Sequence, residues 1–295
     1  MKETWTIEAV VRWATDDFRA RGIESPRLDA EVLLAFALDT DRVRLIVDAR
    51  RPLEADELAR FRELVKRRRK HEPVAFLRGE REFFGRPFRV DARVLIPRPD
   101  TEVLVQVALE RTRHVSLSMR ALDLCTGSGC VAISLGRERP TAQVLASDIS
   151  EGALAVARDN AHRLGAFNVG WASGDLFGAL ASRAGLRFDV VTANPPYIPS
   201  EEIATLAEDI RSFEPILALD GGQDGLDLLR RIVQDAPAFL VDGGVLAVEV
   251  GAGEAPDVGQ LFEQRGFEDV RIARDYGGIE RVVSGAWPAG MRVLP

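Results

Sequence analysis

The sequence predicts an α/β protein in which a doubly wound, mostly parallel sheet follows a small all-helical domain, with a β-hairpin between them. Two observations favour this fold. Residues 1–80 carry hydrophobic side chains at helical spacing. From residue 121 onward, strand-like and helix-like segments alternate, which is typical of a parallel sheet covered by helices. A length of 295 residues suits about two domains, and we place the boundaries at 1–80, 81–112 and 113–295.

Four helices are expected in the first 80 residues. Thr6 is suited to cap the first helix and Gly22 to end it, because a hydroxyl accepts from free backbone N–H groups and glycine adopts a left-handed turn. Ser25 and Pro26 would begin the second helix, since proline is tolerated in a first turn. The second, third and fourth helices are expected over 28–38, 43–47 and 55–70.

A hairpin and then the sheet follow. Residues 82–96 are rich in Phe and Val and are interrupted by Gly85 and Pro87, which predicts a β-hairpin. The last two strands flank a Gly-rich turn at 275–278 and are expected to pair antiparallel at the sheet edge. Other strands are expected over 121–125, Gln143–Asp148, Phe188–Ala193 and 245–250, and helices over 101–112, from Cys130, over 150–164, near 226–240 and near 256–265.

The charge distribution limits the classes of partner. The net charge of −7 argues against long contact with a nucleic-acid backbone, because such binding depends on Lys and Arg neutralising phosphates. The basic run Lys66-Arg67-Arg68-Arg69-Lys70 ends the fourth predicted helix, where cations complement the helix dipole. We interpret this run as a solvated helix end, and a docking patch for an acidic or nucleic-acid-bearing partner is the alternative.

Cysteine and histidine usage predicts neither a metal site nor a disulfide framework. Cys125 and Cys130 are the only cysteines, and the three histidines are scattered along the chain. The N-terminus lacks the apolar run of a signal peptide, and no apolar stretch approaches the length of a membrane span. We therefore expect a cytoplasmic protein without membrane contact.

A Gly-rich turn predicts a cofactor site. The run Cys125-Thr126-Gly127-Ser128-Gly129 follows a predicted strand and opens a helix, where glycines let the backbone approach a ligand. Asp148 ends the next strand, 19 residues after Gly129, and is suited to accept hydrogen bonds from the ribose hydroxyls of an adenosine-containing cofactor. The pattern also fits NAD. Asp123 favours S-adenosyl-L-methionine, because an acidic group there suits its sulfonium and amino end. Asp175 and Leu176, after a third strand, would flank the adenine.

The run Asn194-Pro195-Pro196-Tyr197 predicts the reacting site. It follows the strand Phe188–Ala193, at the edge where open α/β sheets bind ligands. An amide nitrogen is a poor nucleophile because its lone pair is delocalised into the carbonyl. The side-chain oxygen of Asn194 and the carbonyl of Pro195 can accept both N–H bonds of an amide, the prolines restrict the backbone, and Tyr197 offers a stacking face. The run indicates methyl transfer to a planar, amide-like nitrogen.

With these motifs, nearly the whole chain resembles the release-factor glutamine methyltransferases of the PrmC/HemK type. The resemblance implies a Rossmann-like class I S-adenosyl-L-methionine methyltransferase fold and methylation of the glutamine side-chain amide in the Gly-Gly-Gln motif of peptide-chain release factors. The product would be S-adenosyl-L-homocysteine, and the helical domain would help to hold the release factor. We expect a monomer without direct contact to nucleic acid. The segments that carry the resemblance are 27–34, 79–85, 96–102, 194–197, 213–215 and 274–276.

The resemblance also implies roles for individual residues. Thr126 to Gly129, Asp148, Leu176 and Asn194 would contact the cofactor, while Asn194, Pro195, Pro196 and Tyr197 would hold the glutamine. Arg98 and Thr101 would shape the pocket mouth, although Thr101 is equally suited to cap the helix that follows.

Two positions depart from the family pattern. Cys125 stands where many relatives have a glycine, and a non-glycine residue there predicts a negative φ. Leu176 stands where some members have an aromatic residue, so looser packing around the adenine is expected.

Three alternatives stay open. A glutamine methyltransferase of a ribosomal protein shares the segment 123–130 but differs at 96–102 and lacks the ending 274–276. A DNA or RNA adenine methyltransferase shares the Asn-Pro-Pro-Tyr run, but the net acidity and the lack of a separate basic recognition domain disfavour it. A non-catalytic cofactor-binding protein would need a damaged site. The chain's own Gly221-Gly222-Gln223 is interpreted as a coincidence, with Gln223 expected to open a helix.

Overall fold

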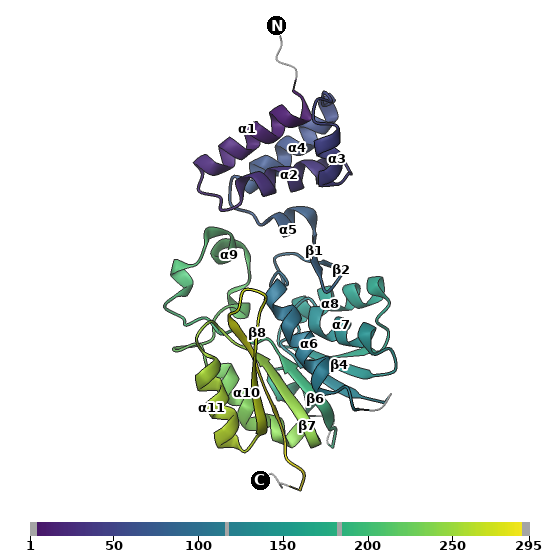
Figure 1. Ribbon diagram of the computed structural model, residues 1–295, viewed down its shortest axis with the longest axis vertical. Coiled ribbons are helices and arrows are strands. Elements are labelled where there is room, and N and C mark those ends of the chain that lie inside the picture. Colours follow the sequence, from purple (N-terminus) through teal and green to yellow (C-terminus); the bar gives the residue numbers. More distant parts are fainter. Residues whose placement is uncertain (1–4, 116–117, 182–184, 291–295) are drawn as a thin grey trace. The chain divides into compact units, whose positions relative to one another are not determined.

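Helices alone form one part of the chain, and a mixed sheet flanked by helices forms the other. The computed structural model describes residues 5–115, 118–181 and 185–290 (Figure 1). Contacts divide the chain into a helical unit, Met1–Glu80 with Ala207–Phe213, and a sheet unit, Arg81–Leu206 with Glu214–Pro295. Among the described residues, no helix has the length and apolar character that crossing a bilayer requires.

The helical unit contains the four predicted helices. Thr6 caps α1 by accepting a hydrogen bond from the Ala9 N–H at 3.3 Å, and Pro26 opens α2, as predicted. Two short helices, α5 and α9, were not predicted. The core of the unit is built from apolar side chains that include Phe18, Leu34 and Phe61. The helices are α1 (Ile7–Ala20), α2 (Pro26–Ala37), α3 (Arg42–Val47), α4 (Ala55–Arg68), α5 (Val74–Arg78) and α9 (Glu208–Phe213).

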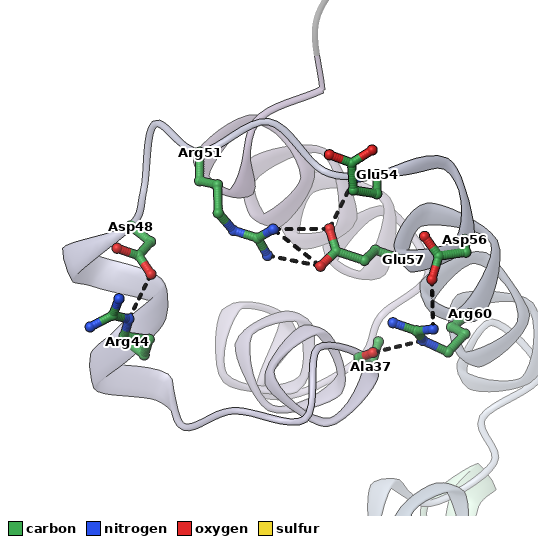
Figure 2. Close-up of polar contacts among 8 residues, drawn as sticks. All are labelled: Ala37, Arg44, Asp48, Arg51, Glu54, Asp56, Glu57 and Arg60. Atoms are coloured by element: carbon green, nitrogen blue, oxygen red, sulfur yellow. Dashed lines mark hydrogen bonds and ion pairs between the residues drawn. The ribbon is translucent and has the colours of Figure 1, made fainter.

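Ion pairs and a cap hold α4 in place. Glu57 accepts a hydrogen bond from the Glu54 N–H at 2.9 Å, which closes a capping box at the start of the helix (Figure 2). The same carboxylate binds the Arg51 guanidinium at 3.1 Å. Arg60 donates to the carbonyl of Ala37 at 3.0 Å, and this bond joins α4 to the end of α2 (Figure 2).

Four residues of the basic run at the end of α4, Lys66 to Arg69, form ion pairs within the helical unit. Arg68 is buried and binds Asp29 at 2.8 Å. Arg69 binds Asp17 at 2.7 Å, and Lys66 and Arg67 bind Glu63 and Glu72. These pairs favour the interpretation of the run as a helix end rather than a free docking patch.

The predicted hairpin is confirmed, but its strands lie within 80–89, and the rest of the predicted span, 90–96, is not in a strand. Strands β1 (Glu80–Phe83) and β2 (Arg86–Arg89) are joined by Phe84 and Gly85, both at positive φ, as a tight two-residue turn requires. Phe83 and Phe88 are buried and meet edge to face at 5.9 Å, inside the cluster that also holds residues of α6 (Glu102–Arg111) and α7 (Cys130–Glu138).

The sheet has the strand order β5-β4-β3-β6-β7-β9-β8 in the described part of the chain. The first five strands are parallel, and β9 and β8 pair antiparallel at the edge, as predicted. The chain runs from β3 outward to β5 and then returns to β6 on the other side of β3, so β3 and β6 flank a switch point where such sheets bind ligands. The strands are β3 (Arg120–Leu124), β4 (Gln143–Asp148), β5 (Val169–Ser173), β6 (Phe188–Ala193), β7 (Leu240–Glu249), β8 (Glu268–Arg274) and β9 (Glu280–Ala286).

Helices cover both faces of the sheet (Figure 1). Alternate residues of a strand point to opposite faces, so on β7 Ala247 packs with one cluster and Leu246 with the other. One face is covered by α6 (Glu102–Arg111), α7 (Cys130–Glu138) and α8 (Glu151–Leu164), and the other by α10 (Asp227–Asp235) and α11 (Ala255–Arg265).

Two predictions around α10 are wrong. The helix expected near 226–240 ends at Asp235, a short 3-10 segment (Ala236–Phe239) follows, and β7 begins at Leu240 rather than at 245. Pro237 explains the early end, because proline removes a backbone donor and clashes with the preceding turn. Gln223 lies in a turn and does not open a helix, since α10 begins at Asp227.

Candidate active site

A cavity of about 320 Å³ lies at the carboxyl ends of β3, β4 and β6. Because these strands are parallel, the loops that follow them meet at one edge of the sheet. Eleven of the residues predicted for the site line this cavity: Arg98, Thr101, Cys125, Thr126, Gly127, Ser128, Asp148, Asp175, Leu176, Asn194 and Pro196.

Four named residues do not line the cavity. Asp123 is buried inside β3, and Gly129 stands behind the turn as the residue that precedes α7. Pro195 is buried, and Tyr197 is half-buried beyond Pro196. The structure therefore places these four beside the cavity rather than on its surface.

The turn after β3 takes left-handed backbone conformations. The φ angles are +54° at Cys125, +55° at Gly127 and +82° at Gly129. The predicted negative φ at Cys125 is wrong, because the turn is tied to β4: Thr126 N–H donates to the Ser147 carbonyl at 3.0 Å. A left-handed non-glycine residue costs about 1–2 kcal/mol, and the bonds of the turn offset this cost.

Gly129 is required by packing as well as by its φ. A Cβ at this position would lie 2.8 Å from Ile133 Cδ1 and 3.1 Å from Ala157 Cβ. At Gly127, by contrast, no heavy atom of the described residues other than the glycine and its two chain neighbours lies within 4 Å of such a Cβ. The close approach at Gly129 brings α7 against α8 directly behind the turn.

Asp148 is held as an acceptor on the cavity wall. Its two carboxylate oxygens accept hydrogen bonds at 2.9 Å from the N–H groups of Gly127 and Ser150. Burial raises the pKa of Asp148, and the backbone donors oppose that rise. The carboxylate is thereby fixed in position at the end of β4, where a ribose would lie in an adenosine site.

Asp123 joins β3, the turn and β6. It accepts hydrogen bonds from the hydroxyls of Thr126 at 2.6 Å and Thr192 at 2.8 Å. Burial raises its pKa to about 7, against the opposing effect of these donors. Its contacts support the turn from below.

The segment after β5 forms another wall. Leu176 is buried with φ +47°, so its side chain is directed by a left-handed backbone. Asp175 binds Arg231 of α10 at 2.6 Å. Arg231 also lines the cavity, and the sequence analysis missed it because only the fold brings α10 to this edge.

Asn194 and Thr101 meet although they are 93 residues apart. Asn194 Nδ2 donates to Thr101 Oγ1 at 3.1 Å, which leaves the side-chain oxygen of Asn194 as an acceptor. Thr101 stands at the N-cap position of α6, but its side chain makes no capping hydrogen bond. Of the two roles considered for Thr101, the structure therefore supports the one in the pocket.

Tyr197 contacts a residue that the sequence analysis missed. Its hydroxyl lies 3.4 Å from Oε1 of Glu249, a buried carboxylate at the end of β7. Burial raises the pKa of Glu249 to about 7 and also raises the pKa of Tyr197. The signal for Glu249 was present in the sequence, as a single acidic residue in the apolar strand 245–250.

Two segments that carry the family resemblance are joined by one buried carboxylate. Glu214 binds Arg98 at 2.5 Å and accepts a hydrogen bond from the Ile96 N–H at 3.1 Å. The Glu214 side chain is 1% exposed, whereas that of Arg98 is 32% exposed. Arg98 is thereby held at the cavity, with part of its side chain open to solvent.

Known proteins resemble this chain along nearly its whole length. A family model of the PrmC N-terminal domain matches residues 9–79, and one of a methyltransferase domain matches 121–214. The release factor glutamine methyltransferase of Geobacter sulfurreducens is 46% identical over 283 residues, covering 96% of this chain and 97% of that protein. The one of Rhodopirellula baltica is 40% identical over 286 residues, covering 95% and 96%.

A solved structure supports the fold independently. A methyltransferase from Pyrococcus furiosus, 18% identical, superimposes with a TM-score of 0.51 over 70% of this chain and 91% of that chain. At this identity the likeness concerns the fold alone, and it agrees with the predicted class I methyltransferase sheet. The family is shown by the relatives that match over nearly the full length. This chain belongs to the release factor glutamine methyltransferase family.

Proposed function

We propose that this chain transfers a methyl group from S-adenosyl-L-methionine to the side-chain amide nitrogen of the glutamine in the Gly-Gly-Gln motif of peptide-chain release factors. The observation that carries the proposal is the position of Asn194, which lines the cavity with its nitrogen bound to Thr101 and its oxygen left as an acceptor. An amide substrate has two N–H bonds, and such an acceptor can hold one of them. The names of the full-length relatives point to the same substrate.

The cavity suits the proposed cofactor. Its volume of about 320 Å³ falls in the usual range for small-molecule sites, about 300–1,000 Å³. The buried hydroxyl of Ser128 has no hydrogen-bond partner among the described residues, which suits a polar ligand. We assign cofactor binding to Cys125, Thr126, Gly127, Ser128, Asp148, Asp175, Leu176 and Asn194, which line the cavity, and to Asp123 and Gly129, which lie directly behind the turn.

Bound S-adenosyl-L-methionine would supply a methyl group on positively charged sulfur. The bond from the methyl carbon to the amide nitrogen would replace its bond to sulfur, and the electron pair of the broken bond would stay on sulfur. The proton displaced from the nitrogen would go to solvent. Asn194 Oδ1 and the Pro195 carbonyl would hold the amide so that its lone pair faces the methyl carbon. Pro196 and Tyr197 would confine the planar group, and Arg98 and Thr101 would border the entrance. Positioning of this kind can contribute about 7–11 kcal/mol.

The three segments of the chain would have different roles. We assign recognition of the release factor to 1–80, a linking role to 81–112, and cofactor binding and catalysis to 113–295. The predicted absence of nucleic-acid contact, a monomeric state and a cytoplasmic location belong to the same proposal.

Mass spectrometry tests the function. Purified release factor is incubated with the protein and S-adenosyl-L-methionine, and the peptide containing Gly-Gly-Gln is fragmented. We expect one added methyl group on the glutamine, and none when either the protein or the cofactor is omitted. Ribosomes and DNA serve as parallel acceptors. Methyl transfer to one of these, with none to the release factor, would overturn the proposal.

A further inference from the structure

Glu249 is a buried carboxylate for which the proposed chemistry has no use. It ends β7 with 1% of its surface exposed, and its Oε2 has no hydrogen-bond partner among the described residues. An isolated buried charge is costly, so a carboxylate kept here needs a reason. Its neighbours belong to the reacting site: the Tyr197 hydroxyl lies 3.4 Å from Oε1, and the nearby Thr101 hydroxyl lowers its pKa.

Thr101 lies beside both Glu249 and Asn194. Thr101 Oγ1 accepts from Asn194 Nδ2 at 3.1 Å. A hydroxyl has one proton. When it donates that proton in a hydrogen bond to a carboxylate, it can only accept a hydrogen bond from its other neighbour. An asparagine amide could present either its oxygen or its nitrogen to the cavity. With Thr101 restricted to accepting, the nitrogen turns toward Thr101 and the oxygen faces the cavity.

We propose that Glu249 is a positioning residue that sets the orientation of the Asn194 amide through Thr101 and anchors Tyr197 through its hydroxyl. The inference rests on the proposed function, since it assigns to Asn194 Oδ1 the task of accepting a substrate N–H. If the Asn194 amide were inverted, its N–H groups would face the N–H of the substrate amide. The hydrogen bond from the substrate to Asn194 Oδ1 would then be lost.

Protonation of Glu249 should weaken this control. Burial holds its pKa near neutrality, at about 7. The charged and titratable groups that face it are Arg281, which favours the ionised form, and Asp100, which opposes it, together with Tyr197 and the buried Cys130. Once protonated, the carboxyl can donate to Thr101, whose own proton is then free to turn toward Asn194. The proposal therefore predicts that kcat falls as the pH decreases through about 7.

Three substitutions test the chain of contacts. Thr101→Val removes the hydroxyl, Thr101→Ser keeps it, and Glu249→Gln removes the charge at similar size. Removing a residue that orients a ligand-binding side chain lowers affinity or activity about 10- to 100-fold, as the outer-shell partners of metal ligands show. We expect a loss of about this size in kcat for Thr101→Val and Glu249→Gln, with largely retained KM for the release factor and retained calorimetric affinity for cofactor. Thr101→Ser should restore most of the rate. Glu254→Gln, at a half-buried carboxylate beyond β7, is the matched control and should keep the wild-type pH dependence.

A readout without catalysis separates orientation from other roles. The side-chain amide protons of Asn194, identified in an NMR spectrum by their loss in Asn194→Asp, should show slow exchange in wild type and faster exchange in Thr101→Val and Glu249→Gln. Unchanged exchange, or a Glu249→Gln rate that falls at low pH as in wild type, would overturn the inference. If Thr101→Val fails to bind cofactor, Glu249→Gln decides by the same criteria. If wild-type protein leaves the release factor unmethylated, the proposed function fails, and the amide signal still tests the network.

Discussion

Replacing Asp123 by asparagine should change how the stability of the protein depends on pH. The Asp123 carboxylate is 1% exposed and accepts hydrogen bonds from Thr126 and Thr192. Burial, with a smaller contribution from Asp148, raises its pKa from 3.8 to about 7. Asp123→Asn has nearly the same size and removes the ionisation, so the comparison isolates the effect of the charge.

The size of the effect follows from the pKa. The folded protein holds the Asp123 proton more tightly than the unfolded chain by about 3 pKa units, which corresponds to about 4 kcal/mol. Because the folded pKa is the higher one, this stabilisation is fully present below about pH 4 and is lost as the pH rises through about 7. The unfolding free energy of wild type minus that of Asp123→Asn should therefore fall by about 4 kcal/mol between these limits.

Urea unfolding measured between about pH 4 and pH 8 checks this prediction. Circular dichroism follows the helices, and tryptophan fluorescence reports on both units, since Trp5 and Trp13 lie in the helical unit and Trp171 and Trp287 in the sheet unit. Taking the difference between the two proteins cancels titrations that they share. A difference that stays constant with pH would show that Asp123 is not desolvated. A difference that rises with pH would mean that folding lowers the pKa of Asp123, as expected of a carboxylate stabilised in its ionised form.

The remaining predictions concern the site and its supports. Asn194→Ala should lower the methyl-transfer rate by ~10²–10³, and a single-turnover rate within about tenfold of wild type would contradict its role. Arg98→Ala removes a donor from the buried Glu214 carboxylate and should destabilise the protein by about 1–3 kcal/mol in urea unfolding, an effect that disappears in a Glu214→Gln background. Gly129→Ala combines positive φ with a clash and should cost about 1–3 kcal/mol more than Gly127→Ala, which carries the φ penalty alone; equal losses of stability would refute the packing argument.

Local sequence signals predicted most of the elements. β4 and β6 begin and end at the predicted residues, because each is an apolar run bounded by polar or turn residues. The boundary between α10 and β7 was misplaced, since the apolar residues on both sides of Pro237 suit a helix and a buried strand equally. The short helices α5 and α9 were missed because five or six residues carry too little periodicity.

The site was predictable where its residues are adjacent in sequence. The turn after β3 and the Asn-Pro-Pro-Tyr run each follow a strand, Asp148 ends one, and parallel strands bring their carboxyl ends to one edge. Cys125 shows the limit of such reasoning. Its side chain suggested a negative φ, but the bonds that tie the turn to β4 impose +54°.

The sequence by itself determined the fold class, the methyltransferase family and the residues that follow the strands, because periodicity and short motifs are local properties of the chain. Only the tertiary structure decided which residues meet across the sheet. The contacts of Asn194 with Thr101, of Tyr197 with Glu249 and of Arg98 with Glu214 span from 52 to 116 residues. Their hydrogen bonds depend on strand order and helix packing, which no local pattern encodes.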